Sequence, residues 1–95
     1  MVEIRLSDSA WGDLDDITDY IALDSPRHAM IFSEKVFERL EILHDYQNSG
    51  RMVPEFQNED IRELILGSYR IVYRIYSEKL VVVLRIIHGS KLLDF

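Results

Sequence analysis

The sequence predicts a single α+β domain with the element order βααβββ, in which an antiparallel sheet carries a helical hairpin on one face. Two observations predict it. In the first half of the chain, apolar residues recur at steps of three and four, the spacing of one face of a helix. In the second half, three segments rich in β-branched and aromatic residues are separated by only two or three residues, so neighbouring strands must pair antiparallel. With no linker or internal repeat, residues 1–95 make one domain.

The chain begins with a short strand and a first helix. VEIRL, at residues 2–6, alternates between apolar and charged residues and is typical of a strand. Ser7 is a suitable helix N-cap, and Asp8 favours the positive end of a helix. The buried stripe of this helix is predicted at Ala10, Leu14, Ile17 and Ile21.

A second helix is predicted after Asp24, with Ser25 as its N-cap and Pro26 at its first position. It should end near Tyr46, before Asn48-Ser49-Gly50. Because so few residues connect the two helices, they are expected to form an antiparallel hairpin. The buried stripe of the second helix is predicted at Ala29, Phe32, Val36, Leu40 and Leu43, widened by Phe37 and Ile42.

Residues 48–60, NSGRMVPEFQNED, have the composition of a loop. A loop of this length is unusual in so small a domain and is often functional. Strands are then predicted at IRELIL (61–66), YRIVYRIY (69–76) and LVVVLRIIH (80–88), with a tight turn at Gly67-Ser68.

Strand alternation assigns the side chains of residues 69–76 to two faces of the sheet. The more apolar side, which should meet the helices, consists of Tyr69, Ile71, Tyr73 and Ile75. Arg70 and Arg74 point the other way, to what we call the second face, beside Val72 and Tyr76. A purely solvated face would be more polar, so this mixed surface is typical of one that binds something.

The two neighbouring strands can each add an arginine to the second face if the strand registers agree. Arg62 shares a side with Leu64 and Leu66. Arg85 shares a side with Val81, Val83 and Ile87. His88 falls on the opposite side from Arg85, with Leu84 and Ile86, unless a β-bulge changes its direction.

Charge is distributed unevenly along the chain. The net charge of −6 argues against generic nucleic-acid binding. Residues 1–50 carry 11 acidic and 4 basic side chains, whereas residues 61–91 carry 2 acidic and 6 basic ones. This asymmetry indicates a basic working surface; the alternative is that the arginines merely keep a sheet soluble.

Several classes of site are not expected. The chain has no cysteine, so it has no disulfide frame and no thiolate site. His28 and His44 lack helical partners suited to a metal, and we expect no metal and no cofactor. The N-terminal MVEIRLSD lacks a signal-peptide pattern, and no apolar run is long enough to span a membrane, so a cytoplasmic protein is expected.

The element order, the segment IRELILGSYRIVYRI, the VPE loop and the VVVLRIIHGSKLL ending together resemble the RelE/ParE superfamily, the toxins of type II toxin–antitoxin modules. The resemblance covers nearly the whole chain and is strongest from Gly50 onward. It implies a growth-inhibiting toxin neutralised by a cognate antitoxin, which typically wraps around the toxin. It identifies the superfamily better than the target: ParE-type members inhibit DNA gyrase, and RelE-type members cleave mRNA in the ribosomal A site.

The nucleases of this superfamily use two different sets of catalytic residues, and the sequence matches each set in part. In the RelE style, Arg62 and Arg70 match a lysine and a phosphate-binding arginine, Leu64 replaces a second lysine, and Lys91 lies near a second arginine. The catalytic tyrosine has no counterpart.

In the YoeB style, the resemblance matches Glu55, Arg70 and His88 to a catalytic glutamate, arginine and histidine, with Gly89 in place of an aromatic residue. For His88, the alternative is a strand-end histidine bonded to the tail.

Because the RelE-style residues are mostly missing and the chain is acidic, the leading hypothesis is a ParE-like toxin acting on DNA gyrase. The alternatives are a ribosome-dependent mRNA endoribonuclease that uses Arg70, His88 and Glu55, and an inactive antitoxin-binding module. Residues expected to contact the antitoxin or the target are Arg62, Arg70, Arg74, Arg85 and Lys91. Between the two arginines of residues 69–76, the resemblance favours Arg70 for function, with Arg74 as support or an antitoxin contact.

Overall fold

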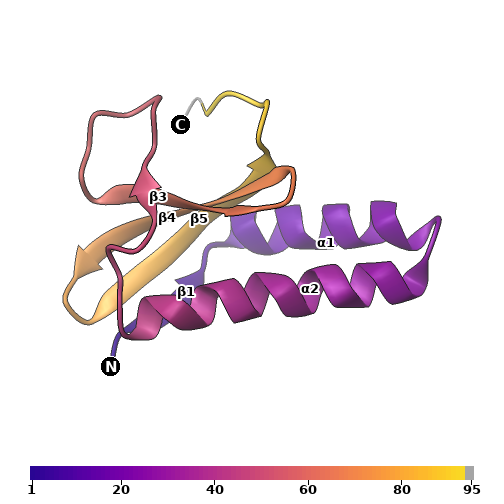
Figure 1. Ribbon diagram of the computed structural model, residues 1–95, viewed down its shortest axis with the longest axis horizontal. Coiled ribbons are helices and arrows are strands. Elements are labelled where there is room, and N and C mark those ends of the chain that lie inside the picture. Colours follow the sequence, from indigo (N-terminus) through magenta and orange to yellow (C-terminus); the bar gives the residue numbers. More distant parts are fainter. Residues whose placement is uncertain (94–95) are drawn as a thin grey trace.

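A helical hairpin lies on one face of a five-stranded sheet in the computed structural model, which describes residues 1–93 (Figure 1). The turn between the two helices extends well past the end of the sheet (Figure 1). The elements in chain order are β1 Glu3–Leu6, α1 Asp8–Ala22, α2 Pro26–Glu41, the 3₁₀ helix η1 Ile42–His44, β2 Arg51–Met52, β3 Ile61–Leu66, β4 Tyr69–Ser77 and β5 Leu80–His88.

The strand order is β1-β5-β4-β3-β2, and the predicted α+β fold is confirmed. Strands β3, β4 and β5 form the expected antiparallel meander, with Gly67 at a φ of 57° in the β3–β4 turn. Two features add to the prediction. The N-terminal strand, β1, pairs in parallel with β5, so the sheet is mixed. No tight turn joins these two strands, so their connection does not force them to pair antiparallel. The predicted loop also contains β2, which pairs with β3 over two residues.

Both helices begin where the sequence predicts. The Ser7 hydroxyl accepts a hydrogen bond from the Ala10 N–H, and the Ser25 hydroxyl accepts one from the His28 N–H. Each such cap is worth about 1 kcal/mol relative to alanine. The α-helical part of α2 ends at Glu41, earlier than predicted, because the chain tightens into η1 before Tyr46.

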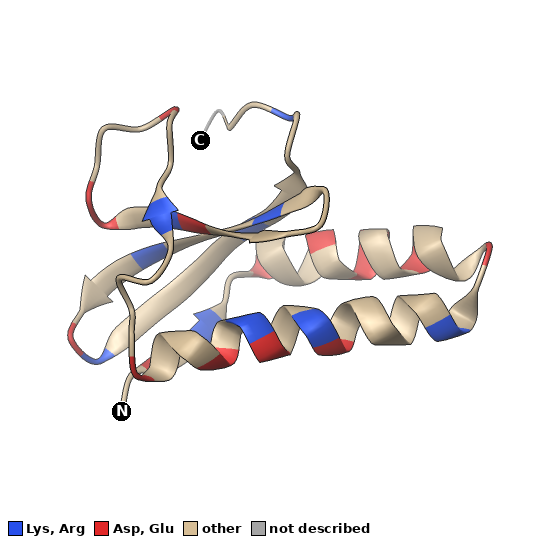
Figure 2. Ribbon diagram, in the orientation of Figure 1, with Lys and Arg blue, Asp and Glu red and all other residues tan. Residues whose placement is uncertain are grey.

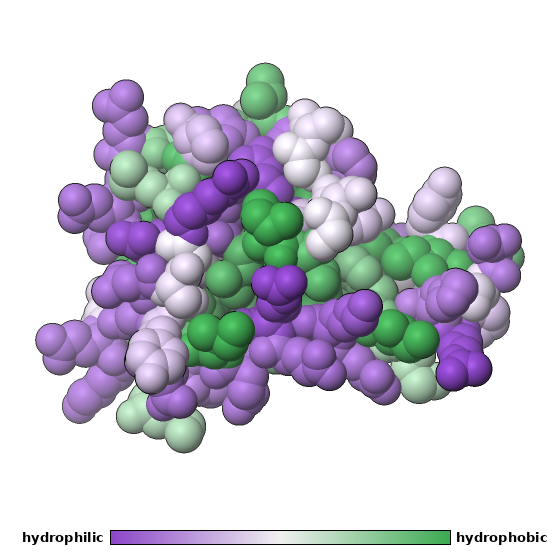
Figure 3. All heavy atoms as spheres, in the orientation of Figure 1, coloured by the Kyte–Doolittle hydropathy of each residue, from purple (hydrophilic) through white to green (hydrophobic). Residues whose placement is uncertain are grey.

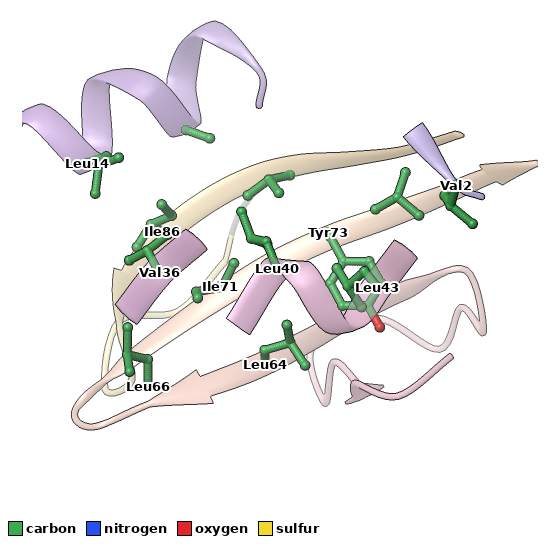
Figure 4. Close-up of a cluster of buried hydrophobic side chains, with 13 residues drawn as sticks. Val2, Leu14, Val36, Leu40, Leu43, Leu64, Leu66, Ile71, Tyr73 and Ile86 are labelled. Carbon is green, nitrogen blue, oxygen red and sulfur yellow. The ribbon is translucent and has the colours of Figure 1, made fainter. Parts of the chain in front are cut away.

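The main core lies between the helices and the sheet (Figure 4). Tyr73 lies at its centre with no exposed surface, and its hydroxyl donates to the Gln47 carbonyl at 2.8 Å and accepts from the Gly50 N–H at 3.0 Å. The buried members are Val2, Ala10, Leu14, Val36, Leu40, Leu43, Leu64, Leu66, Ile71, Tyr73, Val81, Val83 and Ile86.

Two residues predicted to be buried, Phe37 and Ile42, are exposed. Phe37 is 41% exposed and Ile42 is 45% exposed, so the prediction that they widen the buried stripe is wrong. Phe37 instead lies beside the half-exposed Trp11 of α1, with ring centroids 6.1 Å apart.

A β-bulge corrects the predicted faces of β5. Val72 lies opposite Arg85 and Tyr73 lies opposite Val83, so Leu84 has no partner on β4. The extra residue reverses the alternation. Val81 and Val83 therefore pack in the main core and do not share the second face with Ile87, contrary to the sequence prediction.

The face predicted for Arg62 is also wrong. Arg62 lies opposite Tyr73, on the helix side, because Leu64 and Leu66 of the same strand belong to the main core. Its guanidinium donates to the backbone carbonyls of Gly50 and Glu59, both at 2.9 Å.

Part of the second face is covered by a smaller apolar cluster. The loop after β2 and residues 89–93, which we call the C-terminal residues, lie on the side of the sheet away from the helices (Figure 1). The buried members are Val53, Val72, Ile87 and Leu93, with Phe56 and Ile61 packed against them. We call this group the second-face cluster.

The surface of the hairpin is unevenly charged. Helix α1 contains five aspartates and no lysine or arginine, and acidic segments alone appear along it in Figure 2. In the space-filling view, hydrophilic residues dominate and hydrophobic ones form separate patches (Figure 3). No helix within residues 1–93 is long and apolar enough to cross a membrane.

Candidate functional site

Arg70 lies inside the protein rather than on an open surface. It lies near the start of β4, opposite Ile65 on one side and Ile87 on the other, and its side chain is 6% exposed. Alternation places it on the second face, as predicted, but the loop after β2 and the C-terminal residues cover that part of the face. The expectation that Arg70 is open to a partner is therefore wrong.

Two carboxylates hold the Arg70 guanidinium. Its Nη1 and Nη2 donate to the two oxygens of Glu55 at 2.9 and 2.7 Å, in a bidentate pair. Nη1 also donates to Glu63 at 3.0 Å. We call Glu55, Glu63 and Arg70 the arginine clamp.

The clamp joins segments that lie far apart in the sequence. Nη2 of Arg70 donates to the backbone carbonyl of Lys91, and Glu55 accepts the backbone N–H of Leu93 at 3.1 Å. Glu63, whose side chain is fully buried, also accepts from Arg51 of β2 at 2.6 Å. One guanidinium therefore fastens the loop and the C-terminal residues onto the sheet.

The charges of the clamp and of Arg51 balance, because Arg51 and Arg70 pair with the carboxylates of Glu55 and Glu63. The hydrogen bonds from Arg70 lower the pKa of Glu55 from 4.5 to about 2, and the N–H of Leu93 adds to this effect against the opposing effect of burial. The same pairing raises the pKa of Arg70. Both side chains are therefore ionised at neutral pH. A carboxylate with so low a pKa is a weak general base.

His88 does not join Glu55 and Arg70. It lies at the end of β5 opposite Tyr69, on the helix side, and the two rings meet edge to face with centroids 5.7 Å apart. Its Nδ1 lies 2.7 Å from the Ser90 hydroxyl. The bulge falls earlier in β5, so it does not turn His88 toward the second face.

The other predicted contact residues are dispersed. Arg85 forms a bidentate pair with Asp13 of α1 at 2.7 and 3.0 Å, and Asp13 also accepts the Ile86 N–H at the open edge of β5. Lys91 is exposed and offers its backbone carbonyl to the clamp. Arg74 is exposed and stacks on Tyr76.

Sequence reasoning missed Glu63 and Asp13. Glu63 is the one acid in an otherwise apolar and basic strand. An acid in that position could have been predicted to pair with an arginine of a neighbouring strand. Asp13 gave no such signal among the many aspartates of α1. Among residues 1–93, no group of three or more acidic or histidine side chains is arranged to hold a metal ion.

Comparisons with known proteins agree with this architecture. The family model described as the ParE toxin of the type II toxin–antitoxin system parDE matches residues 4–93. A chain of the chromosomal ParDE system from P. aeruginosa is 26% identical, with a TM-score of 0.75, over 95% of this chain and 98% of that one. A chain of the RelBE2 toxin–antitoxin complex from Mycobacterium tuberculosis is 25% identical, with a TM-score of 0.60, over 92% and 96%.

A chain of the DinJ–YafQ complex from E. coli is 15% identical with a TM-score of 0.57, over 99% of this chain and 100% of that one, which is a likeness of fold. No curated protein gives a significant match. The family match covers far more than half of the residues and includes both helices and the whole meander. The chain therefore belongs to the ParE toxin family of type II toxin–antitoxin systems.

Proposed function

We propose that this toxin inhibits DNA gyrase without cleaving RNA and that a cognate antitoxin neutralises it. The observation that carries the proposal is that the Arg70 guanidinium is already bonded to acceptors within the protein. The resemblance to the nuclease branches assigns this arginine to phosphate binding, yet its guanidinium is buried and bonded to two carboxylates and a backbone carbonyl. A phosphate would have to displace these acceptors.

The remaining nuclease residues add further support. Glu55 is ionised and paired, with a pKa of about 2, so it has little tendency to take a proton from a ribose hydroxyl. His88 lies on the helix side of the sheet, away from this pair. An RNA-cleaving site needs a base, an acid and free positive charge close together.

An antitoxin partner is supported by two solved relatives, one from a ParDE system and one from a complex described as toxin–antitoxin. It also accounts for large hydrophobic side chains that the chain leaves exposed on the hairpin, among them Tyr20, Leu23 and Met30 at 73%, 86% and 63%. A partner that covers such residues would remove them from water. Action on gyrase would place the toxin in the cytoplasm.

Two assays on the toxin produced without antitoxin test the proposal. We expect inhibition of supercoiling by purified gyrase and no ribosome-dependent cleavage of mRNA. Cleavage that disappears in a folded Arg70→Lys variant would refute the proposal and favour the endoribonuclease alternative. Absence of both activities and of growth arrest would favour an inactive antitoxin-binding module.

Neutralisation is tested separately. The product of a small gene beside the toxin gene should co-purify with the toxin and restore both growth and supercoiling. If no neighbouring product does so, the antitoxin part of the proposal fails while the gyrase part stands.

A further inference from the structure

Within residues 1–93, the chain covers one part of the sheet's second face and leaves another part exposed. Four residues of β4 point to this face, and they differ sharply in exposure. Arg70 and Val72 are buried beneath the loop and the C-terminal residues, whereas Arg74 and Tyr76 are exposed. We call the uncovered part, around Arg74 and Tyr76, the open sheet face.

Strand registers define this surface. Arg74 lies opposite Ile61 of β3 and opposite Val82 of β5, and Val82 in turn lies opposite Arg5 of β1. The row thus crosses four strands: the half-buried Val82 lies between the exposed Arg5 and Arg74, and the half-buried Ile61 lies on the other side of Arg74. In the neighbouring row, Glu3 lies opposite the half-buried Leu80, and Glu3 forms an ion pair with Arg5.

Arg74 differs from the other arginines of the sheet in its partners. Arg5, Arg51, Arg62, Arg70 and Arg85 each donate to an oxygen acceptor. Within residues 1–93, the contact recorded for Arg74 is with the ring of Tyr76, whose centroid lies 5.0 Å from the Arg74 Cζ. The ring holds the guanidinium in place and leaves its N–H donors directed at solvent.

The covered part of the second face, around Arg70, indicates which chemical groups would bind the open sheet face. Over Arg70, the loop supplies the carboxylate of Glu55, and Val53 and Phe56 of the same loop pack in the second-face cluster. Arg74 lies on the same strand and the same side, four residues further on. The ligand that suits it has the same chemistry, a carboxylate flanked by apolar side chains.

We propose that the open sheet face is the surface by which the toxin binds its target protein, with a carboxylate of the target on Arg74 and apolar side chains on Tyr76 and Val82. This inference rests on the proposed function, because it takes the target to be a protein. Local charge supports that choice. A nucleic-acid backbone would favour several unpaired cations, whereas Arg5 is already neutralised by Glu3 and the chain carries −6 overall. Tyrosine and arginine are also the residues that most often dominate protein interfaces.

The test compares inhibition of gyrase supercoiling and growth arrest for the wild type, Arg74→Ala and Arg74→Glu. Arg39→Ala is the matched control, since Arg39 is an exposed arginine on α2 and hence lies on the opposite side of the sheet. We expect Arg74→Ala to weaken inhibition about 10- to 30-fold and Arg74→Glu by roughly 100-fold or more, with Arg39→Ala within about 2-fold of the wild type. All variants should keep the wild-type melting temperature, because the altered side chains are exposed.

The outcomes separate this inference from the proposed function. If the wild type arrests growth without inhibiting gyrase, the gyrase proposal fails, and the inference stands only if Arg74→Glu abolishes growth arrest while Arg39→Ala does not. If both Arg74 variants act like the wild type, or if Arg39→Ala weakens activity equally, the inference is wrong. Arg74-dependent binding of a DNA or RNA oligonucleotide in a filter assay would overturn it in favour of a nucleic-acid ligand. A wild type with neither activity would overturn both.

Discussion

Replacing Glu55 with glutamine should destabilise the protein in a way that depends on pH. The pKa of Glu55 is lowered from 4.5 to about 2 by its hydrogen bonds from Arg70, and its side chain is only 17% exposed. Each unit of pKa depression corresponds to about 1.4 kcal/mol of folding free energy, so the ionised carboxylate contributes about 3 kcal/mol at neutral pH. Glutamine keeps an acceptor for Arg70 but not the charge, and Glu63 remains as a partner. We therefore expect a loss of about 2–3 kcal/mol at pH 7.

The direction of the pH dependence follows from the lowered pKa. Between about pH 4.5 and pH 2, the unfolded chain binds a proton at Glu55 that the folded protein does not. The stabilisation is complete above this range and is lost as the pH falls through it. The difference in unfolding free energy between the wild type and Glu55→Gln should thus shrink from its full value near pH 5 to less than ~0.5 kcal/mol near pH 2, where about half of the folded wild type is protonated at Glu55.

Urea denaturation followed by far-UV circular dichroism, at several pH values between 2 and 7, measures this difference. Glu59→Gln is the matched control, because Glu59 lies in the same loop, is exposed, and contributes its backbone carbonyl rather than its carboxylate to Arg62. It should change stability by less than ~0.5 kcal/mol throughout. A Glu55→Gln penalty that stays constant with pH, or one no larger than that of Glu59→Gln, would refute the ionised clamp.

Four further substitutions test the packing of the core and the two helices by the same denaturation measurement. Tyr73→Phe removes the hydroxyl that bonds Gln47 and Gly50, and it should lower the unfolding free energy by about 1–3 kcal/mol; an unchanged value would contradict this role. Gly50→Ala places a Cβ 2.6 Å from the Tyr73 hydroxyl oxygen and should lower stability by about 1–3 kcal/mol or prevent folding. Gly12→Ala, where nothing lies within 4 Å, should instead raise stability by about 0.5–1 kcal/mol. Ser25→Ala removes the α2 cap and should lower stability by about 1 kcal/mol, which an unaltered denaturation midpoint would disprove.

The elements of the fold were predictable because their signals are local. Ser7 and Ser25 mark helix starts through their own hydroxyls, and Gly67 marks a turn through its backbone freedom. Hydrophobic spacing then identified the faces of α1 and β4, both of which pack as expected. Each of these inferences needs only a few neighbouring residues.

The errors concern contacts between distant segments. The extra residue at Leu84 shifts the alternation of β5, and nothing in LVVVLRIIH marks where a bulge must fall. Strand alternation puts Arg62, Leu64 and Leu66 on one face. The prediction takes that face to be a binding surface, whereas Leu64 and Leu66 belong to the main core. The covering of Arg70 depends on a loop and a C-terminal segment whose paths the strand pattern does not encode.

The two arginines of β4 show why the same residue type on the same face can have opposite roles. Arg70 and Arg74 are equivalent by alternation, and the resemblance to nucleases favoured Arg70 for function. Their surroundings reverse this preference. Arg70 is enclosed by carboxylates that the chain supplies, so removing it would leave Glu55 and Glu63 without their shared cation and would chiefly affect folding. Within residues 1–93, Arg74 contacts the ring of Tyr76 and keeps its donors for a partner, so its loss should leave folding intact and affect binding. A stability measurement and an activity measurement on the same pair of alanine variants should therefore give opposite rankings.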